Sequence, residues 1–394
     1  MADATSAGAT PLLPGLPDDI VIWEILVRLP PKALLCSRAV HPSWRRITST
    51  RDFLLTHHAR QPTLLVASGH DDGSGEYYRD IIVFGHPAAA DAQLEHFTQL
   101  DERDCSVVAS CDGLLLLSYE TEGACFSICN PATHQCAPLP VPCDLMMPLG
   151  MYRHHPTGEY RILMYDKNEE EIEGENEEIY VRDGGCCIFE LGSVQPSRNI
   201  GYPPEAEQVL SRCGHGAVVL LRGNMHWYLE QRENGGDMVL VFDIATESFR
   251  HMQAPVLQVA PDCPLYNDLF DMDGTLGMFS CNDDAAIVDI WVLKDYENEV
   301  WTFKCKIELP VIEIKLLCGD DDSLYAVVIH GDGELLVLVQ FAGWLLQVDM
   351  EGKLVGSFHH DKVIAGQLQL KQTLVPHTFF QTLEYCNAYE WDPV

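Results

Sequence analysis

Apolar residues follow two different periods along this chain, one before and one after about residue 60. Between residues 16 and 53 they recur at helical spacing. From residue 62 onward they form short runs divided by Gly, Asp, Asn and Pro, which is typical of β-strands. The pattern predicts a small helical module followed by a large antiparallel β domain.

The first predicted helix carries apolar residues on two faces. Its acidic first turn at Pro17-Asp18-Asp19 and the stop at Leu29-Pro30-Pro31 set its limits. One predicted face consists of Ile22, Ile25, Leu26 and Leu29, and a second stripe consists of Ile20, Trp23 and Val27. Three short helices cannot bury both faces, so the module is expected to cover one of them with a partner protein. The plainer alternative is a helical cap on the rest of the chain.

Two further helices complete the predicted module. Residues 32–40 form the second, with Leu34 and Leu35 facing inward. It must end near His41, because a residue before proline is pushed out of the α region. Pro42 then takes the first position of a third helix that includes Trp44.

The strand-rich region repeats one scheme: a Gly-containing turn, an apolar strand, a second strand ending at Asp or an aromatic residue, a polar turn and a closing strand. The units span residues 62–100, 104–140, 148–200, 215–253, 270–310 and 322–360, and 368–383 remain to close a ring. Four-stranded units at this spacing predict a six-bladed β-propeller, because each unit buries its face only beside a neighbour. Two packed β-sandwiches are the alternative.

Net charge, the length of apolar runs and the spacing of cysteines each disfavour some classes of protein. The 394 residues carry 25 Lys and Arg against 59 Asp and Glu, a formal charge of −34 that disfavours nucleic acid and would attract a basic protein segment. No apolar run is long enough to cross a membrane, and the start of the chain does not read as a signal peptide. The 15 cysteines lack C-x-x-C pairs, so we expect reduced thiols in packing roles rather than a disulfide framework.

The sequence nominates no catalytic, cofactor or metal site. It contains no G-x-S-x-G, G-x-x-x-x-G-K or H-E-x-x-H motif. The adjacent pairs His57-His58, His154-His155 and His359-His360 are expected to point to opposite sides, and Asp271-Met272-Asp273-Gly274 is interpreted as a turn rather than a calcium loop. The acidic run 167–178 is expected to be a solvated loop.

A propeller enzyme or a carbohydrate- or protein-binding module with an N-terminal cap is the alternative function. It predicts that Ile20, Trp23 and Val27 are buried against the β domain.

The helical module resembles the F-box motif along its whole length. The resemblance is carried by Leu16-Pro17-Asp18-Asp19-Ile20, Ile25-Leu26-Val27-Arg28-Leu29-Pro30-Pro31-Lys32-Ala33-Leu34, Arg38-Ala39-Val40 and Ser43-Trp44-Arg45. The characteristic positions, which face either the adaptor or the module's own core, are Leu16, Pro17, Ile20, Ile25, Leu29, Pro30, Leu34, Val40 and Trp44. His41-Pro42 departs from the family's usual Cys and basic residue.

The β domain resembles the F-box-associated domain of plant F-box proteins. The matching segments are Ser110-Cys111-Asp112-Gly113-Leu114-Leu115, Cys129-Asn130-Pro131-Ala132-Thr133, Gly223-Asn224-Met225-His226-Trp227-Tyr228 and Phe242-Asp243-Ile244-Ala245-Thr246. The resemblance implies an F-box over 13–55 and a substrate-recognition domain over 62–385. The residues before them, 1–12, are expected from their own sequence to form a flexible tail.

The two resemblances together imply a non-catalytic receptor subunit in the cytoplasm or nucleus. Its F-box would bind the SCF adaptor and so a cullin-RING ubiquitin ligase, and its β domain would bind a protein target. A degenerate F-box protein that recruits no target is a further alternative.

Overall fold

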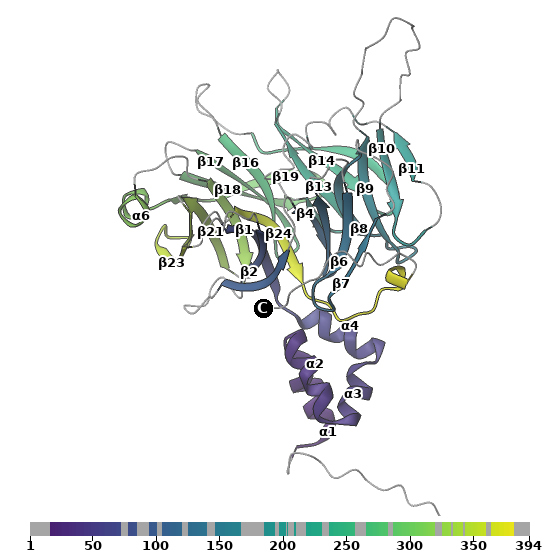
Figure 1. The fold of residues 1–394 in the computed structure, drawn as a ribbon. Coiled ribbons are helices and arrows are strands. Elements are labelled where there is room, and N and C mark those ends of the chain that lie inside the picture. Colours follow the sequence, from purple (N-terminus) through teal and green to yellow (C-terminus); the bar gives the residue numbers. More distant parts are fainter. Residues whose placement is uncertain are drawn as a thin grey trace, which may run out of the picture.

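The computed structural model consists of a short helical module below a ring of antiparallel sheets (Figure 1). It describes residues 16–71, 78–84, 94–100, 105–119, 125–139, 146–166, 185–193, 197–201, 203, 209, 218–230, 236–256, 265–282, 287–319, 325–331, 334–341, 343–359 and 364–381. The predicted tail over 1–12 and the acidic run 167–178 lie outside these residues.

The helical module contains a first helical segment and three α-helices. The segment is built from α1 (Asp18–Ile20), a π-helical turn η1 (Val21–Ile25) and a 3-10 turn η2 (Leu26–Arg28). It is followed by α2 (Pro31–Val40), α3 (Pro42–Thr48) and α4 (Arg51–Arg60). The last of these extends the module beyond the three predicted helices.

Proline residues set the limits of these helices. Pro31 and Pro42 occupy first-turn positions of α2 and α3, where the missing N–H costs nothing. His41, which precedes Pro42, is extended at φ −143° and ψ 131°. The predicted break at His41 and the start of the third helix at Pro42 are both confirmed, although this position departs from the family pattern.

Six four-stranded antiparallel sheets, numbered here as blades 1 to 6, form the β domain. Blade 1 contains β24 (Ile364–Lys371), β1 (Thr63–Asp71), β2 (Tyr78–Phe84) and β3 (Leu94–Leu100). Blade 2 contains β4 (Cys105–Cys111), β5 (Leu114–Tyr119), β6 (Cys125–Asn130) and β7 (Gln135–Pro138). Blade 3 contains β8 (Met146–Arg153), β9 (Tyr160–Asp166), β10 (Gly185–Glu190) and β11 (Arg198–Gly201).

The remaining blades follow the same meander. Blade 4 contains β12 (Val219–Leu221), β13 (Asn224–Leu229), β14 (Met238–Asp243) and β15 (Ser248–Gln253). Blade 5 contains β16 (Leu265–Met272), β17 (Thr275–Asn282), β18 (Ile287–Asp295) and β19 (Val300–Glu308). Blade 6 contains β20 (Tyr325–Gly331), β21 (Glu334–Phe341), β22 (Trp344–Val348) and β23 (Leu354–His359), and α6 (Val311–Cys318) connects blade 5 to it.

The ring closes through the C-terminal strand. β24 pairs antiparallel with β1, so blade 1 combines the first and last strands of the domain. The predicted units coincide with the blades to within a few residues. The predicted propeller is therefore confirmed, and the sandwich alternative is wrong.

The apolar cores of the ring lie between blades. The cluster around Leu114 and Ile162 joins blades 2 and 3, and the cluster around Val241 and Met278 joins blades 4 and 5. Each of the other pairs of neighbours, including blades 6 and 1, shares a cluster of the same kind. A single blade thus buries its faces only when both neighbours are present.

The repeated Asn or Asp of the units ends the third strand of a blade and holds the turn that follows. In blade 4, Asp243 Oδ1 accepts from the backbone N–H groups of Ala245 and Thr246 at 2.9 and 2.8 Å. In blade 2, Asn130 Oδ1 accepts from Ala132 N–H at 3.1 Å. The repeat is therefore a turn signal that carries no chemistry of its own.

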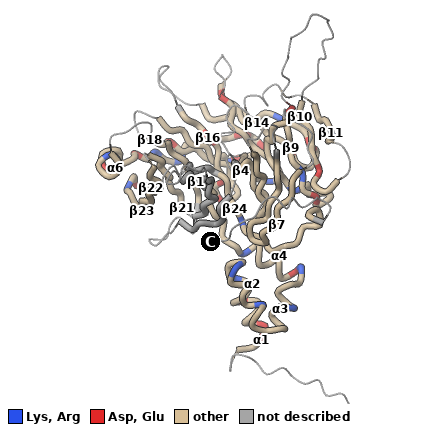
Figure 2. The backbone as a smooth tube through the Cα atoms, viewed as in Figure 1, with Lys and Arg blue, Asp and Glu red and all other residues tan. Residues whose placement is uncertain are grey.

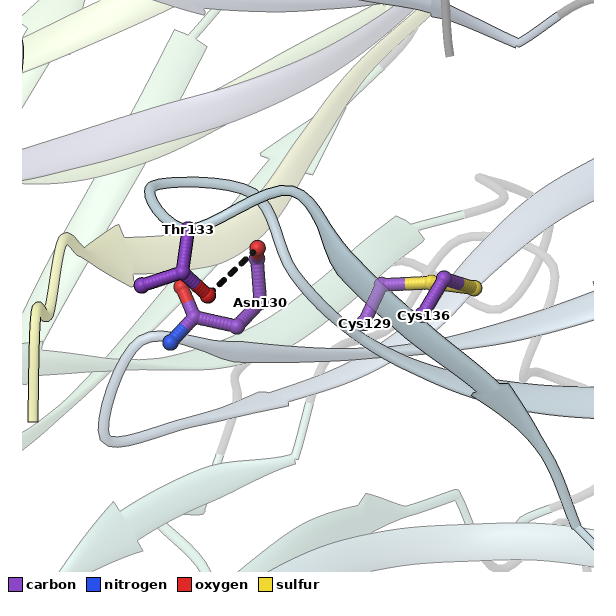
Figure 3. The surroundings of a disulfide bond; sticks show 4 residues. All are labelled: Cys129, Asn130, Thr133 and Cys136. Carbon is purple, nitrogen blue, oxygen red and sulfur yellow. Dashed lines mark hydrogen bonds between the residues drawn. A yellow bond between two sulfur atoms is a disulfide. The ribbon is translucent and has the colours of Figure 1, made fainter. Parts of the chain in front are cut away.

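One disulfide departs from the expectation of free thiols. Cys129 and Cys136 lie opposite each other on β6 and β7 and are bonded, next to the turn that Asn130 and Thr133 form (Figure 3). Four other described cysteines, Cys111, Cys186, Cys187 and Cys281, are buried among apolar side chains, in the expected packing role. A register that places two cysteines directly opposite each other cannot be read from their spacing alone, which is why this pair was missed.

Candidate functional site

The helical module presents apolar side chains to solvent along its first helical segment. The exposed large residues there are Leu16, Ile20, Trp23 and Ile25, and α2 adds Leu35 and Val40. We call this set the apolar face. An exposed cluster of large apolar residues on so small a module marks an interaction surface.

The opposite side of the same segment is buried and positions this face. Val21, Ile22, Leu26 and Val27 pack with Leu34, Phe53 and Leu54 in one cluster. The ring of Trp23 lies 5.4 Å from that of Phe53, so it leans on the core while 37% of it remains exposed. The packing holds the apolar face in a fixed orientation.

The division between faces differs from the predicted stripes. Ile25, assigned to the inward face, is 42% exposed, and Val27, assigned to the second stripe, is fully buried. The π-helical turn η1 (Val21–Ile25) explains the change, because each π turn holds an extra residue and rotates the positions after it. A prediction that assumes 3.6 residues per turn therefore assigns these residues to the wrong face of the helix.

The nine predicted motif positions fall into three groups. The exposed ones are Leu16, Pro17, Ile20, Ile25, Pro30 and Val40, the partly buried ones are Leu29 and Trp44, and the buried one is Leu34. Leu29 and Trp44 pack against the module core. Only the first group is free to face a partner without unfolding the module.

Two members of the apolar face were absent from the predicted site. Trp23 was assigned to a stripe but not to the motif positions, and Leu35 was expected to face inward with Leu34, yet it is 41% exposed. Adjacent residues on a helix diverge by about 100°, so Leu34 and Leu35 could not both face the core. The spacing of Leu34 and Leu35 could therefore have been used to predict that only one of them is buried.

The module is joined to the β domain by the segment that follows β24. Leu374 and Val375 belong to the module's core cluster. Lys371 Nζ donates to Ala59 O at 2.8 Å, and His58 Nδ1 donates to Gln372 O at 3.0 Å. The β domain thus covers part of the module's apolar surface, as expected for a helical cap. Ile20 and Trp23 nevertheless remain exposed, whereas the enzyme alternative predicted that they would be buried against the β domain.

The paired histidines on α4 face different parts of the molecule. His57 Nε2 donates to Leu29 O at 2.8 Å inside the module, whereas His58 reaches Gln372 of the β domain. Burial is the main cause that lowers the pKa of His57. The predicted divergence of this pair is confirmed, although the two residues lie on a helix rather than a strand.

A cavity of about 230 Å³ lies at the centre of the ring, lined by the innermost strand of every blade. Its acidic residues are Asp112 and Asp271, which lie at hairpin turns. Asp271 Oδ1 accepts from Gly274 N–H at 2.8 Å, and burial is the main cause that raises the pKa of Asp271. The Asp271 carboxylate therefore holds its own turn, and Asp271-Met272-Asp273-Gly274 is a hairpin turn as predicted. The Asp112 carboxylate accepts from the hydroxyl of Tyr160 at 3.0 Å.

Among the residues that the structure describes, no three His, Cys, Asp or Glu side chains are arranged to hold a metal ion. The described helices are also too short or too polar to span a bilayer.

Comparison with known proteins shows the family to which this chain belongs. Residues 73–351 match the model of the F-box associated beta propeller domain. F-box protein At1g52495 of Arabidopsis thaliana is 26% identical over 309 residues, 73% of this chain and 67% of that protein. F-box protein At5g49610 of the same plant is 24% identical, covering 75% of this chain and 80% of that protein.

Solved structures resemble the chain only weakly. A putative 6-phosphogluconolactonase from Bacteroides fragilis covers 77% of this chain and 98% of its own, at 12% identity and a TM-score of 0.36. A likeness at this level carries no argument about activity.

Proposed function

Because the chain belongs to the family of plant F-box proteins with an F-box associated β-propeller domain, we propose that it is the substrate-recognition subunit of an SCF-type ubiquitin ligase. In this proposal the helical module binds the SCF adaptor and, through it, a cullin-RING ligase. The β domain holds a protein target. The ligase acts in the cytoplasm or nucleus.

The observation that carries the proposal is the apolar face. Its residues Leu16, Ile20, Trp23 and Ile25 are exposed on a module whose other side is packed. Covering these large side chains by a partner is favourable by about 25 cal/mol for each Å² of apolar surface removed from water. Leu35 and Val40 are further exposed apolar residues of the module, on α2.

The proposed role in ubiquitin transfer is positioning without catalysis. Of the two acidic residues in the central cavity, Asp271 holds a hairpin turn and Asp112 accepts from the hydroxyl of Tyr160, and the family's named members are F-box proteins. The covalent chemistry would belong to other subunits, and this chain would bring a target lysine close to them. The acidic β domain favours a target that offers a basic segment.

Co-purification of the full chain with the SCF adaptor tests this proposal. We expect the intact chain to retain the adaptor, and the double change Leu16→Ala with Pro17→Ala to weaken binding. Ile20→Ser should abolish binding, since it puts a hydroxyl at an apolar contact. Ile312→Ser on α6 makes the same change at another exposed isoleucine, 79% exposed against 42% for Ile20, and should leave binding unchanged. An intact chain that does not bind the adaptor would refute the proposal.

A further inference from the structure

A cleft of about 450 Å³ lies where the helical module meets the β domain. Its lining residues come from α4, from blade 3, from Asp112 of blade 2 and from the segment after β24. Figure 1 shows the yellow segment after β24 running past α4. This volume lies within the range of small-molecule sites, and such sites occur preferentially at domain boundaries.

Two arginines line the cleft without a carboxylate partner. Arg51 of α4 and Arg153 at the end of β8 form no ion pair in the part of the chain that the structure describes. Arg153 Nε donates only to the backbone oxygen of Gly158, at 3.3 Å. In a chain where acidic residues outnumber basic ones 59 to 25, two unpaired guanidinium groups beside one cleft are unexpected.

The carboxylates that line the cleft have partners other than Arg51 and Arg153. Asp112 Oδ2 accepts from the hydroxyl of Tyr160 at 3.0 Å. Glu159 and Glu190 both bind Arg161, at 3.1 and 3.3 Å. None of these carboxylates forms an ion pair with Arg51 or Arg153 in the part of the chain that the structure describes. Their planar guanidinium groups suit carboxylate and phosphate oxygens.

Aromatic rings form another wall of the cleft. The ring of His377 stacks on that of Phe379 at 5.3 Å, and the ring of Tyr160 meets both at 5.1 and 5.9 Å. Burial is the main cause that lowers the pKa of His377 to about 4, and Arg51 and Arg153 act in the same direction. At neutral pH the wall is uncharged and offers ring faces and edges to a planar group.

We propose that this cleft binds a small organic anion, with a carboxylate or phosphate group at Arg51 and Arg153 and a planar ring against Tyr160, His377 and Phe379. Because α4 and blade 3 belong to different parts of the molecule, an occupant would contact both and fix the module against the ring. The inference goes beyond the proposed function and does not depend on it, since the free chain suffices to bind the anion.

The test uses the full chain and simple probes in ligand-observed NMR and titration calorimetry. Benzoate and phenyl phosphate carry both features, inorganic phosphate carries only the charge, and benzyl alcohol carries only the ring. We expect benzoate or phenyl phosphate to bind more tightly than inorganic phosphate and benzyl alcohol, and the preferred probe identifies the anionic group. Arg51→Ala and Arg153→Ala should each weaken that binding about tenfold.

Two further variants keep the test decisive. Arg46→Ala removes an exposed arginine of α3 that does not line the cleft, and it should leave probe affinity unchanged. Leu55→Trp fills the cleft from an exposed position of α4 and should abolish binding without disturbing the core. The proposal is overturned if neither probe binds at about 10 mM, far weaker than the affinities of specific sites. It is equally overturned if inorganic phosphate binds as well as phenyl phosphate, or if Arg51→Ala and Arg153→Ala have no effect.

Discussion

Residues 16–60 carry seven Lys and Arg against four Asp and Glu, a net charge of +3, whereas residues 61–394 carry 18 against 54, a net charge of −36. Basic residues are accordingly prominent on the helices in Figure 2. The two parts would attract partners of opposite charge.

The two parts also bury their apolar residues differently. In the ring, every blade shares a core with both neighbours, and β24 closes the circle on β1. The module has one core cluster, and Leu374 and Val375 from the segment after β24 complete it. The ring is therefore a closed cooperative unit, whereas the module depends on a single packed side and one attachment.

The largest expected effect lies at that attachment. Gly113 has φ +86°, and a Cβ there would lie 2.6 Å from Lys371 O and 2.7 Å from Thr373 Cγ2. Gly113→Ala combines an unfavourable backbone conformation with a clash against the attachment segment, so we expect the free energy of unfolding to fall by more than about 3 kcal/mol. Urea denaturation followed by circular dichroism measures it.

Gly274→Ala is the matched control for that change. Gly274 occupies the equivalent hairpin turn of blade 5 at φ +77°, but nothing lies within 4 Å of its added Cβ. It should therefore cost only the backbone term, about 1 to 2 kcal/mol. Equal losses for Gly113→Ala and Gly274→Ala would show that the attachment segment plays no part.

The second prediction compares two neighbouring leucines of the module. Leu34→Ala removes a fully buried side chain and should cost about 3 kcal/mol, confined to the module. Leu35→Ala removes an exposed one and should change stability by about 0.5 kcal/mol or less. Hydrogen exchange should show lost protection in residues 18–60 of the Leu34 variant and unchanged protection in β13. Loss of protection in β13 as well would mean that module and ring unfold together.

Local pattern was sufficient to predict the ring. Alternation along strands and repeated turn residues such as Asn130 and Asp243 are read within about ten residues, and these turns recur in the structure at equivalent places. The limits of α2 and α3 followed in the same way from Pro42 and its effect on His41. Features set by local sterics were therefore predictable.

Which residues of the module are buried and which are exposed could not be predicted, because the answer depends on the number of residues in each helical turn. The π-helical turn before Leu26 exchanges the environments of Ile25 and Val27, and nothing in the apolar pattern marks it. The attachment through Leu374 and the cleft beside Arg51 depend on contacts across more than 300 residues. A single sequence carries no local signal for such contacts.

The third prediction concerns the effect of acid on a buried histidine of the ring. In blade 4, His226 Nδ1 donates to Val219 O at 3.1 Å, and Nε2 accepts from the hydroxyl of Tyr296 at 2.7 Å. Burial is the main cause that lowers the pKa of His226 from 6.5 to about 4. Below pH 6.5 the unfolded chain takes up a proton that the folded ring refuses, so stability falls as pH decreases.

The expected loss from His226 is about 2 kcal/mol between pH 7 and pH 5, at about 1.36 kcal/mol for each pH unit below 6.5. In His226→Gln the dependence of the free energy of unfolding on pH should be shallower by that amount, as measured by urea denaturation across this range. An unchanged slope in this variant would mean that His226 titrates normally in the ring.

The smallest expected effect concerns a surface ion pair of the module. Arg28 Nη2 lies 2.9 Å from Glu24 Oε2, with side chains 64% and 56% exposed, so water and salt screen the attraction. Arg28→Ala should change stability by about 0.5 kcal/mol or less at low salt and by less at high salt. The ring offers the contrast, since buried Glu247 accepts from Tyr152 and Arg161 at 2.8 and 2.7 Å. If Arg28→Ala cost as much as Glu247→Gln in thermal denaturation, the module would be stabilised by charge rather than by its single packed side.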